Sequence, residues 1–206
     1  WQRDFFLWFY FFFIFVAMKK IILFASGAGS NVKNILTYFS GRKDIEFPLI
    51  ITNNPRAGVI DVAKDFGIDI LLVNKSIFYY PTFVDTIDLY KPDLLILAGF
   101  LWRVPEFMVT PYQNKIINIH PSLLPLHGGK GMYGKHVHEA VIAAGEKQSG
   151  ITIHMVNDRY DEGMVLMQKA LKLAAKEDAE SLATKVLALE HEWYPKVIES
   201  LLGITK

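Results

Sequence analysis

Residues 19–39 read KKIILFASGAGSNVKNILTYF, and this stretch decides the fold. It opens with a continuous apolar run, typical of a strand buried on both faces, and closes with the apolar spacing of an amphipathic helix. Gly27 and Gly29 lie between the two and mark a tight strand-to-helix turn. A strand that leads through a glycine turn into a helix is the opening unit of a parallel α/β sheet.

The same alternation continues along the chain. Further strands are expected at 47–52, 69–73, 92–98, 115–119, 151–156 and 165–173, and further helices at 57–66, 82–89, 136–144 and 178–202. Strands separated by helices predict βαβ units. The expected fold class is therefore α/β, a Rossmann-like, doubly wound and mostly parallel sheet with helices on both faces. No repeat or linker divides the chain after Met18, which predicts a single domain.

The first 17 residues, WQRDFFLWFYFFFIFVA, are almost entirely apolar and precede Met18. Their uncharged run is shorter than the roughly 20 residues that a membrane-spanning helix needs. No small-residue cleavage site of a signal peptide follows it. We therefore interpret residues 1–17 as a non-native upstream extension and 18–206 as the functional domain, for which no membrane association is expected. A membrane anchor is the alternative for the first segment.

Composition narrows the classes of function. Lys and Arg total 22 and Asp and Glu total 21, a formal net charge of +1. This balance provides no general attraction to nucleic acid, so no nucleic-acid partner is expected. The chain has no cysteine, which excludes disulfides, thiolate zinc sites and cysteine nucleophiles. A reducing compartment suits such a chain, and a cytoplasmic location is expected.

The turn SGAGSN, residues 26–31, is a candidate phosphate site. Its glycines let the backbone approach a ligand, and the free N–H groups at the start of the helix favour an anion. Ser30 and Asn31 suit helix capping and, with Gly29, are the expected phosphate contacts. Val32 stands where a dinucleotide fingerprint has its third glycine, which favours a single phosphate over NAD. A tight turn with a good cap is the structural alternative.

Residues 118–125, NIHPSLLP, contain the strongest candidates for chemistry. Asn118 and His120 are two residues apart near the end of an expected strand, so their side chains point to the same face. The carboxyl ends of strands line the ligand crevice in an open α/β sheet. An amide beside an imidazole can stabilise an oxyanion and move a proton. A structural histidine after a strand fits these residues equally well.

Read with SGAGSN and a later Asp-x-Gly, this octapeptide resembles the folate-dependent formyltransferase family, over residues 18 to about 203. The resemblance implies transfer of a formyl group from 10-formyltetrahydrofolate, the co-substrate, to the amine of a small phosphorylated substrate. Glycinamide ribonucleotide of purine synthesis is the expected acceptor, no metal is required, and a monomer or homodimer is expected.

The resemblance implies a catalytic trio of Asn118, His120 and Asp161. Protonated His120 and the Asn118 amide would stabilise the oxyanion, while Asp161 would raise the pKa of His120. The family usually has Asp-Gly-Gly or Asp-Ala-Gly where this chain has Asp161-Glu162-Gly163, and Asp158 is a rival carboxylate in the same loop.

The resemblance also implies a folate pocket and supporting residues. The folate-binding residues are expected to be Leu97, Phe100, Leu101, Trp102, Arg103, Val104 and Asn118. Trp102-Arg103 replaces an Arg-hydrophobic pair common in the family, and core packing is the alternative for Leu97 and Phe100. Glu190 would contact the substrate ribose, His154 would support the active site, and Lys185 could assist the phosphate.

Simpler interpretations remain for these supporting residues. Glu190 could be a helix-surface charge and His154 a core histidine. The glycine-rich loop 127–135 is expected to form a flap over the substrate, and Lys130 in it could reach phosphate. His136 and His138 suggest a metal only weakly, because two histidines alone rarely suffice to hold one.

Other functions stay open at this point. They are another formyl-folate-dependent transferase or hydrolase, and a non-catalytic phospho-ligand-binding α/β domain. Methionyl-tRNA formyltransferases have an additional C-terminal domain and formyltetrahydrofolate hydrolases an N-terminal one, and neither is expected here. A serine hydrolase is disfavoured because the sequence has no Gly-x-Ser-x-Gly elbow.

Overall fold

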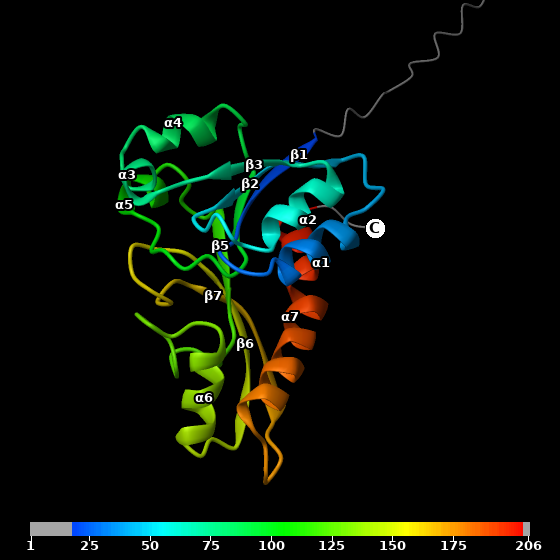
Figure 1. The fold of residues 1–206 in the computed structure, drawn as a ribbon, viewed down its shortest axis with the longest axis vertical. Coiled ribbons are helices and arrows are strands. Elements are labelled where there is room, and N and C mark those ends of the chain that lie inside the picture. Colours follow the sequence, from blue (N-terminus) through cyan, green and yellow to red (C-terminus); the bar gives the residue numbers. More distant parts are fainter. Residues whose placement is uncertain (1–17, 204–206) are drawn as a thin grey trace, which may run out of the picture.

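The computed structural model describes residues 18–203; the expected upstream extension, 1–17, and residues 204–206 lie outside the described part. Seven strands form one sheet in the order β3-β2-β1-β4-β5-β6-β7 (Figure 1). Their bounds are Lys19–Phe24 (β1), Ile45–Thr52 (β2), Asp69–Leu72 (β3), Leu94–Leu97 (β4), Ile116–His120 (β5), Gln148–Met155 (β6) and Val165–Lys172 (β7). Strands β1 to β5 pair in parallel, whereas β6 is antiparallel to β5 and β7 to β6.

Seven helices connect or flank the strands in the described residues. They are α1 (Ser30–Tyr38), α2 (Val59–Phe66), α3 (Lys75–Phe78), α4 (Phe83–Asp88), α5 (Glu106–Val109), α6 (Lys135–Ala143) and α7 (Ala179–Leu201). The sequence did not predict α3 and α5. Each has one turn and buries one residue, Phe78 or Met108, so neither has an apolar period to read.

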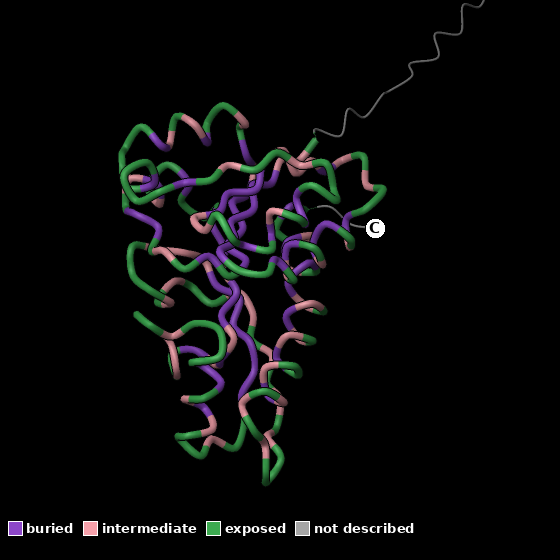
Figure 2. Tube along the Cα trace, viewed as in Figure 1, coloured by how far each residue is buried: buried purple, intermediate pink, exposed green. Residues whose placement is uncertain are grey.

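Strand β1 requires cover on both faces of the sheet. Ile21 and Leu23 belong to one core and Ile22 and Phe24 to the other, and none of the four is more than 1% exposed. Helices α1, α2, α6 and α7 supply apolar residues to the first core, and α3, α4 and α5 to the second. Figure 2 shows the buried residues concentrated along the central strands. The expected α/β fold, with a mostly parallel sheet covered on both faces, is confirmed.

The reversal of direction after β5 places distant residues side by side. In the antiparallel β5–β6 pair, Asn118 lies opposite His154 and His120 opposite Thr152.

Within residues 18–203, no helix is both long and apolar enough to cross a bilayer.

Candidate active site

A cavity of about 320 Å³ opens at the carboxyl ends of β4 and β5. Every expected catalytic and folate-binding residue lines it, and so does His154: the lining includes Leu97, residues 100–104, Asn118, His120, His154 and Asp161. Residues 129–133 of the glycine-rich loop complete the wall, including Lys130. The structure therefore brings residues from four separate segments of the sequence to one site.

His154 holds the Asn118 amide from the neighbouring strand. Asn118 Nδ2 lies 3.2 Å from His154 Nε2, and His154 Nδ1 lies 2.8 Å from the carbonyl oxygen of Met155. Because a carbonyl only accepts, Nδ1 carries a proton, and in the neutral ring Nε2 accepts from the amide. The NH₂ group has two hydrogens, so Asn118 keeps one donor for a ligand. His154 is buried, which fits both a supporting residue and a core histidine.

His120 has a different partner on each ring nitrogen. Its Nε2 donates to the His127 carbonyl at 2.9 Å, and its Nδ1 lies 3.5 Å from Asp161 Oδ2. Burial lowers the pKa of His120 below its ordinary value, and the Asp161 charge and the His127 carbonyl offset this only in part. The expected raising effect of Asp161 is present, but burial outweighs it, because His120 is only 3% exposed and the sequence does not reveal this burial.

Asp161 is held in place as an anion. Its Oδ2 accepts from the Gly129 amide at 2.9 Å, and its Oδ1 lies 3.6 Å from His154 Nε2. Burial alone would raise the pKa of Asp161, but the two histidines and the Gly129 amide outweigh it and the pKa lies below its usual value. The rival Asp158 contributes its backbone carbonyl, which accepts from Arg103.

Gly163 explains the glycine of the Asp-x-Gly pattern. A Cβ at this position would lie 1.7 Å from the Met155 carbonyl oxygen. The loop after β6 thus packs directly on the strand backbone, and Met155 N donates to Met164 O at 2.8 Å. This close approach sets the path of the loop that carries Asp161, itself in a left-handed conformation with φ of 57°.

The expected phosphate and ribose residues form a second group. Gly29, with φ of 80°, is the N-cap of α1, and a Cβ there would lie 2.8 Å from Val59 Cα. Capping by Ser30 or Asn31 side chains was a wrong expectation, because α1 begins at Ser30 without a side-chain cap. The Asn31 amide instead donates to Glu190 Oε2 at 2.7 Å.

Glu190 is not a helix-surface charge, since it is only 8% exposed. Burial raises its pKa to about 7, although the hydrogen bond from Asn31 acts in the opposite direction. The other amide atom of Asn31, Oδ1, is buried and has no partner among the described residues. An unpaired acceptor thus lies beside a carboxylate.

This second group does not line the 320 Å³ cavity, but hydrogen bonds join the two regions. Ser26, at the start of the glycine turn, accepts through Oγ from Leu101 N at 2.9 Å. Tyr194 of α7 donates to the carbonyls of Leu97 and Ile117 at 2.9 and 3.2 Å. The turn, α7 and the cavity wall are therefore parts of one hydrogen-bonded edge of the sheet.

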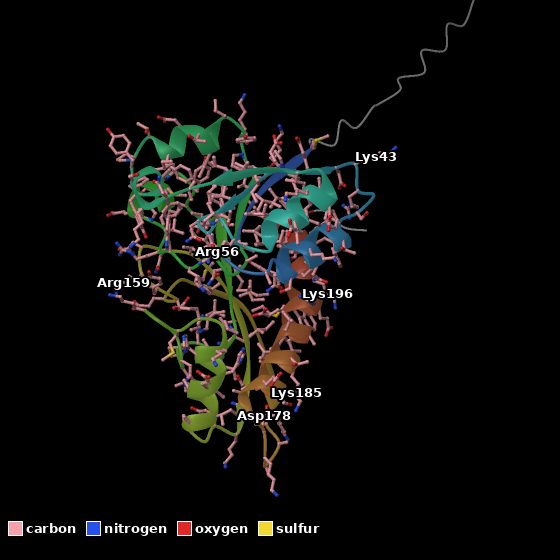
Figure 3. All side chains as sticks on the ribbon, viewed as in Figure 1. Lys43, Arg56, Arg159, Asp178, Lys185 and Lys196 are labelled. Carbon is pink, nitrogen blue, oxygen red and sulfur yellow. The ribbon has the colours of Figure 1, made fainter. Side chains whose placement is uncertain are left out.

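Lys185 does not join this group. Its Nζ lies 2.6 Å from Glu177 Oε2 near the start of α7. Figure 3 shows Lys185 low on α7, on the other side of the view from Arg159, which lines the cavity. Within the described part of the chain, no cluster of three or more histidines and acids could hold a metal ion.

Sequence reasoning missed the main-chain groups of residues 127–129, which contact His120 and Asp161 directly. Backbone atoms leave no residue type to recognise. The only available signal was the Gly128-Gly129 pair, and a Cβ on Gly128 would lie 2.5 Å from Leu124 Cδ2.

Known proteins resemble this chain over most of its length. The family model described as "Formyl transferase" matches residues 19–198. Phosphoribosylglycinamide formyltransferase from Bacillus subtilis is 35% identical over 194 residues, which are 91% of this chain and 96% of the relative. The chloroplastic enzyme of that name from Vigna unguiculata is 38% identical over 192 residues, 90% of this chain. The chain spans 62% of the length of the Vigna relative and 65% of the Arabidopsis thaliana one.

Solved structures show the same likeness. The crystal structure of phosphoribosylglycinamide formyltransferase from Anaplasma phagocytophilum has a TM-score of 0.81 and 34% identity, covering 89% of this chain and 86% of that one. The enzyme of that name from Bacillus halodurans has a TM-score of 0.80 and 32% identity, covering 89% and 95%.

Proposed function

The chain belongs to the formyl transferase family, and on that premise we propose that it transfers a formyl group from 10-formyltetrahydrofolate to the amine of glycinamide ribonucleotide. The observation that carries this proposal is the convergence of Asn118, His120 and Asp161 on one cavity. Relatives named phosphoribosylglycinamide formyltransferase, at 35–39% identity, support the choice of acceptor.

The proposed reaction begins with attack of the substrate amine on the formyl carbon. A new C–N bond forms, and the formyl oxygen becomes an oxyanion on a tetrahedral carbon. The bond from this carbon to the folate nitrogen then breaks, and a proton from the attacking amine passes to the leaving nitrogen. The products are the formylated ribonucleotide and tetrahydrofolate.

Asn118 is the proposed hydrogen-bond donor to the oxyanion, and protonated His120 supplies a positive charge beside it. His154 leaves one Asn118 hydrogen available, and Asn118 and His120 lie on the same face of β5. Loss of one such donor typically costs about 10²- to 10³-fold in rate. Burial opposes the charged form of His120, so the developing oxyanion and Asp161 together would favour the imidazolium during the reaction.

The start of α1 is the proposed phosphate site. Backbone N–H groups at Gly29, Ser30 and Asn31 and the positive end of a nine-residue helix favour an anion. Glu190 and the unpaired Oδ1 of Asn31 provide two acceptors for ribose hydroxyl donors. A ribose phosphate would satisfy groups that the free protein leaves without partners.

The wall formed by residues 97–104 is the proposed folate site. Leu97 and Phe100 are buried and also pack in the second core, so both the pocket and the core interpretations apply to them. Trp102 stacks on Tyr79 with ring centroids 6.0 Å apart and an interplanar angle of 30°. These apolar and aromatic groups suit a flat donor ring.

A reducing compartment such as the cytoplasm suits the proposed enzyme, because no disulfide has to form in a chain without cysteine. Small molecules are its proposed partners, as a monomer or homodimer.

The proposal is tested by incubating the protein with 10-formyltetrahydrofolate and following tetrahydrofolate release with and without glycinamide ribonucleotide. Release should require the ribonucleotide and disappear in His120→Ala. Release without the ribonucleotide would indicate a hydrolase. No release from a folded protein would contradict the proposed function.

A further inference from the structure

The loop of residues 127–129 contacts both titratable groups of the candidate site. The His127 carbonyl accepts from His120 Nε2, and the Gly129 amide donates to Asp161 Oδ2, each at 2.9 Å. Both contacts use main-chain atoms. Their geometry therefore depends on what holds the backbone of this loop.

The side chain of His127 ties this loop to the far end of α6. Its Nε2 lies 3.1 Å from Glu146 Oε1, in the turn that follows the helix. The His127 side chain is 16% exposed and that of Glu146 31%, so water screens the pair less than a fully exposed one. His127 itself has φ of 53°, a conformation that non-glycine residues rarely adopt without support.

We propose that His127 and Glu146 are positioning residues for the reaction. The Glu146 carboxylate fixes the His127 side chain, and the His127 carbonyl in turn fixes the orientation and tautomer of the His120 ring. The catalytic consequence rests on the proposed function, whereas the effect on the ring does not.

The chemistry of this arrangement follows from the different partners of the two ring nitrogens of His120. A carbonyl only accepts, so it keeps the proton of the neutral ring on Nε2 and leaves a lone pair on Nδ1. That lone pair faces Asp161 Oδ2 at 3.5 Å. Two acceptors facing each other favour protonation of Nδ1, which is the change that creates the imidazolium.

Without the carbonyl, the neutral ring has a competing state. Its proton can move to Nδ1 and be donated to Asp161, which satisfies the carboxylate without any positive charge on the ring. The imidazolium would then lose part of its advantage. The contact between His127 and Glu146 thus favours, from outside the cavity, the imidazolium form of His120, whose positive charge stabilises the oxyanion.

A second anchor limits the size of the effect. Ser122 Oγ donates to the Leu126 carbonyl at 2.7 Å, so the start of the loop stays held when Glu146 is removed. We therefore expect displacement of the His127 carbonyl and not collapse of the site.

The direct test is ¹⁵N NMR of the full chain with labelled histidine. Neutral His120 in the wild-type protein should carry its proton on Nε2. Glu146→Ala should raise the fraction with the proton on Nδ1, and Glu146→Gln, which keeps an acceptor for His127, should restore the wild-type tautomer. A wild-type ring protonated on Nδ1 would overturn the proposal without any variant.

Kinetics provide a second readout. Glu146→Ala should lower kcat roughly tenfold, with KM for both substrates changed less than about twofold, because the ring is misplaced and no substrate contact is lost. Glu139→Ala is the matched control. It removes an acidic side chain of α6 whose exposed contacts, with Lys135 at 3.1 Å and His136 at 3.4 Å, do not reach the loop 127–129.

The outcomes separate this proposal from the proposed function. Unchanged kcat and unchanged tautomer in Glu146→Ala overturn the positioning role, as does an equal loss in Glu139→Ala. A wild-type protein that forms no product, but whose His120 tautomer shifts in Glu146→Ala, contradicts the proposed function and supports the positioning of the ring.

Discussion

The Glu190 carboxylate accepts a hydrogen bond from the Asn31 amide at 2.7 Å, although 159 positions separate the two residues. This contact joins the start of α1 to the middle of α7. It also buries the Glu190 carboxylate, and this burial lowers the free energy of unfolding when the group is ionised.

Glu190→Gln should stabilise the protein in a pH-dependent way. Burial raises the pKa of Glu190 from 4.5 to about 7. Below about pH 4.5 both folded and unfolded states hold the proton, and burial of the carboxyl costs little. Between 4.5 and 7 the unfolded chain ionises first, so the free energy of unfolding falls as pH rises, and above 7 the loss is complete. The stability of the variant minus that of wild type should therefore be about 3 kcal/mol larger at pH 8 than at pH 4.

Urea unfolding at the two pH values measures this difference. An equal effect of the substitution at pH 4 and pH 8 would show that the carboxylate is not desolvated.

The same variant should bind glycinamide ribonucleotide more weakly, because a ribose acceptor loses its charge.

Asp161→Asn should lower kcat by roughly 10²-fold. The charge that opposes the burial effect on His120 is removed, so the pKa of His120 falls further and less imidazolium is present at neutral pH. Activity should recover partly as pH is lowered. Asp158→Asn, in the same loop, is the matched control, since only its backbone carbonyl contacts Arg103. Steady-state rates from pH 5 to 9 decide the matter, and equal losses in the two variants would refute the assignment of Asp161.

Gly163→Ala should destabilise the protein by about 3 kcal/mol and reduce activity. The new Cβ would lie 1.7 Å from the Met155 carbonyl, so the loop that carries Asp161 must move. Gly27→Ala is a control for stability, because its Cβ meets no atom within 4 Å. Thermal unfolding of both variants measures the difference. A Gly163→Ala protein as stable as Gly27→Ala would contradict the described packing.

Trp102→Ala should raise KM for the folate donor about 3- to 10-fold, the size of one aromatic contact, with little change in KM for the ribonucleotide. The ring lines the cavity and is held by Tyr79. Tyr80→Ala, at an exposed aromatic residue that does not line the cavity, should leave both constants unchanged. An increase confined to the ribonucleotide KM would place the donor elsewhere.

The sequence pattern predicted the fold well because buried apolar residues recur along the chain with the period of a helix or as the unbroken run of a buried strand. The unbroken apolar run of β1 required two covering layers, and the spacing of α1 and α7 indicated amphipathic helices. One-turn helices such as α3 bury a single residue and give no period, so they were missed.

The positions of site residues were predictable where their side chains share one strand. Contacts between residues far apart in the sequence were not predictable. Asn118 and His120 lie on one face of β5 by the alternation of strand residues. The sign of the His120 pKa shift depends on burial, which spacing does not reveal. The hydrogen bond from the Gly129 amide to Asp161 has no side-chain signature at all.

The loop after β6 is tied to neighbouring backbone at both ends. Val156 N donates to Ile116 O at 2.9 Å, and Met155 N donates to Met164 O. Between these two hydrogen bonds the chain must bring Asp161 back to the carboxyl ends of the strands. The backbone at Gly163 packs so closely on Met155 that it has no room for another path. Insertions or deletions of even one residue would rotate the carboxylate away from the imidazole. Natural length variation should therefore accumulate in the loop 129–134, and the segment 157–163 should keep its length wherever the chemistry is kept.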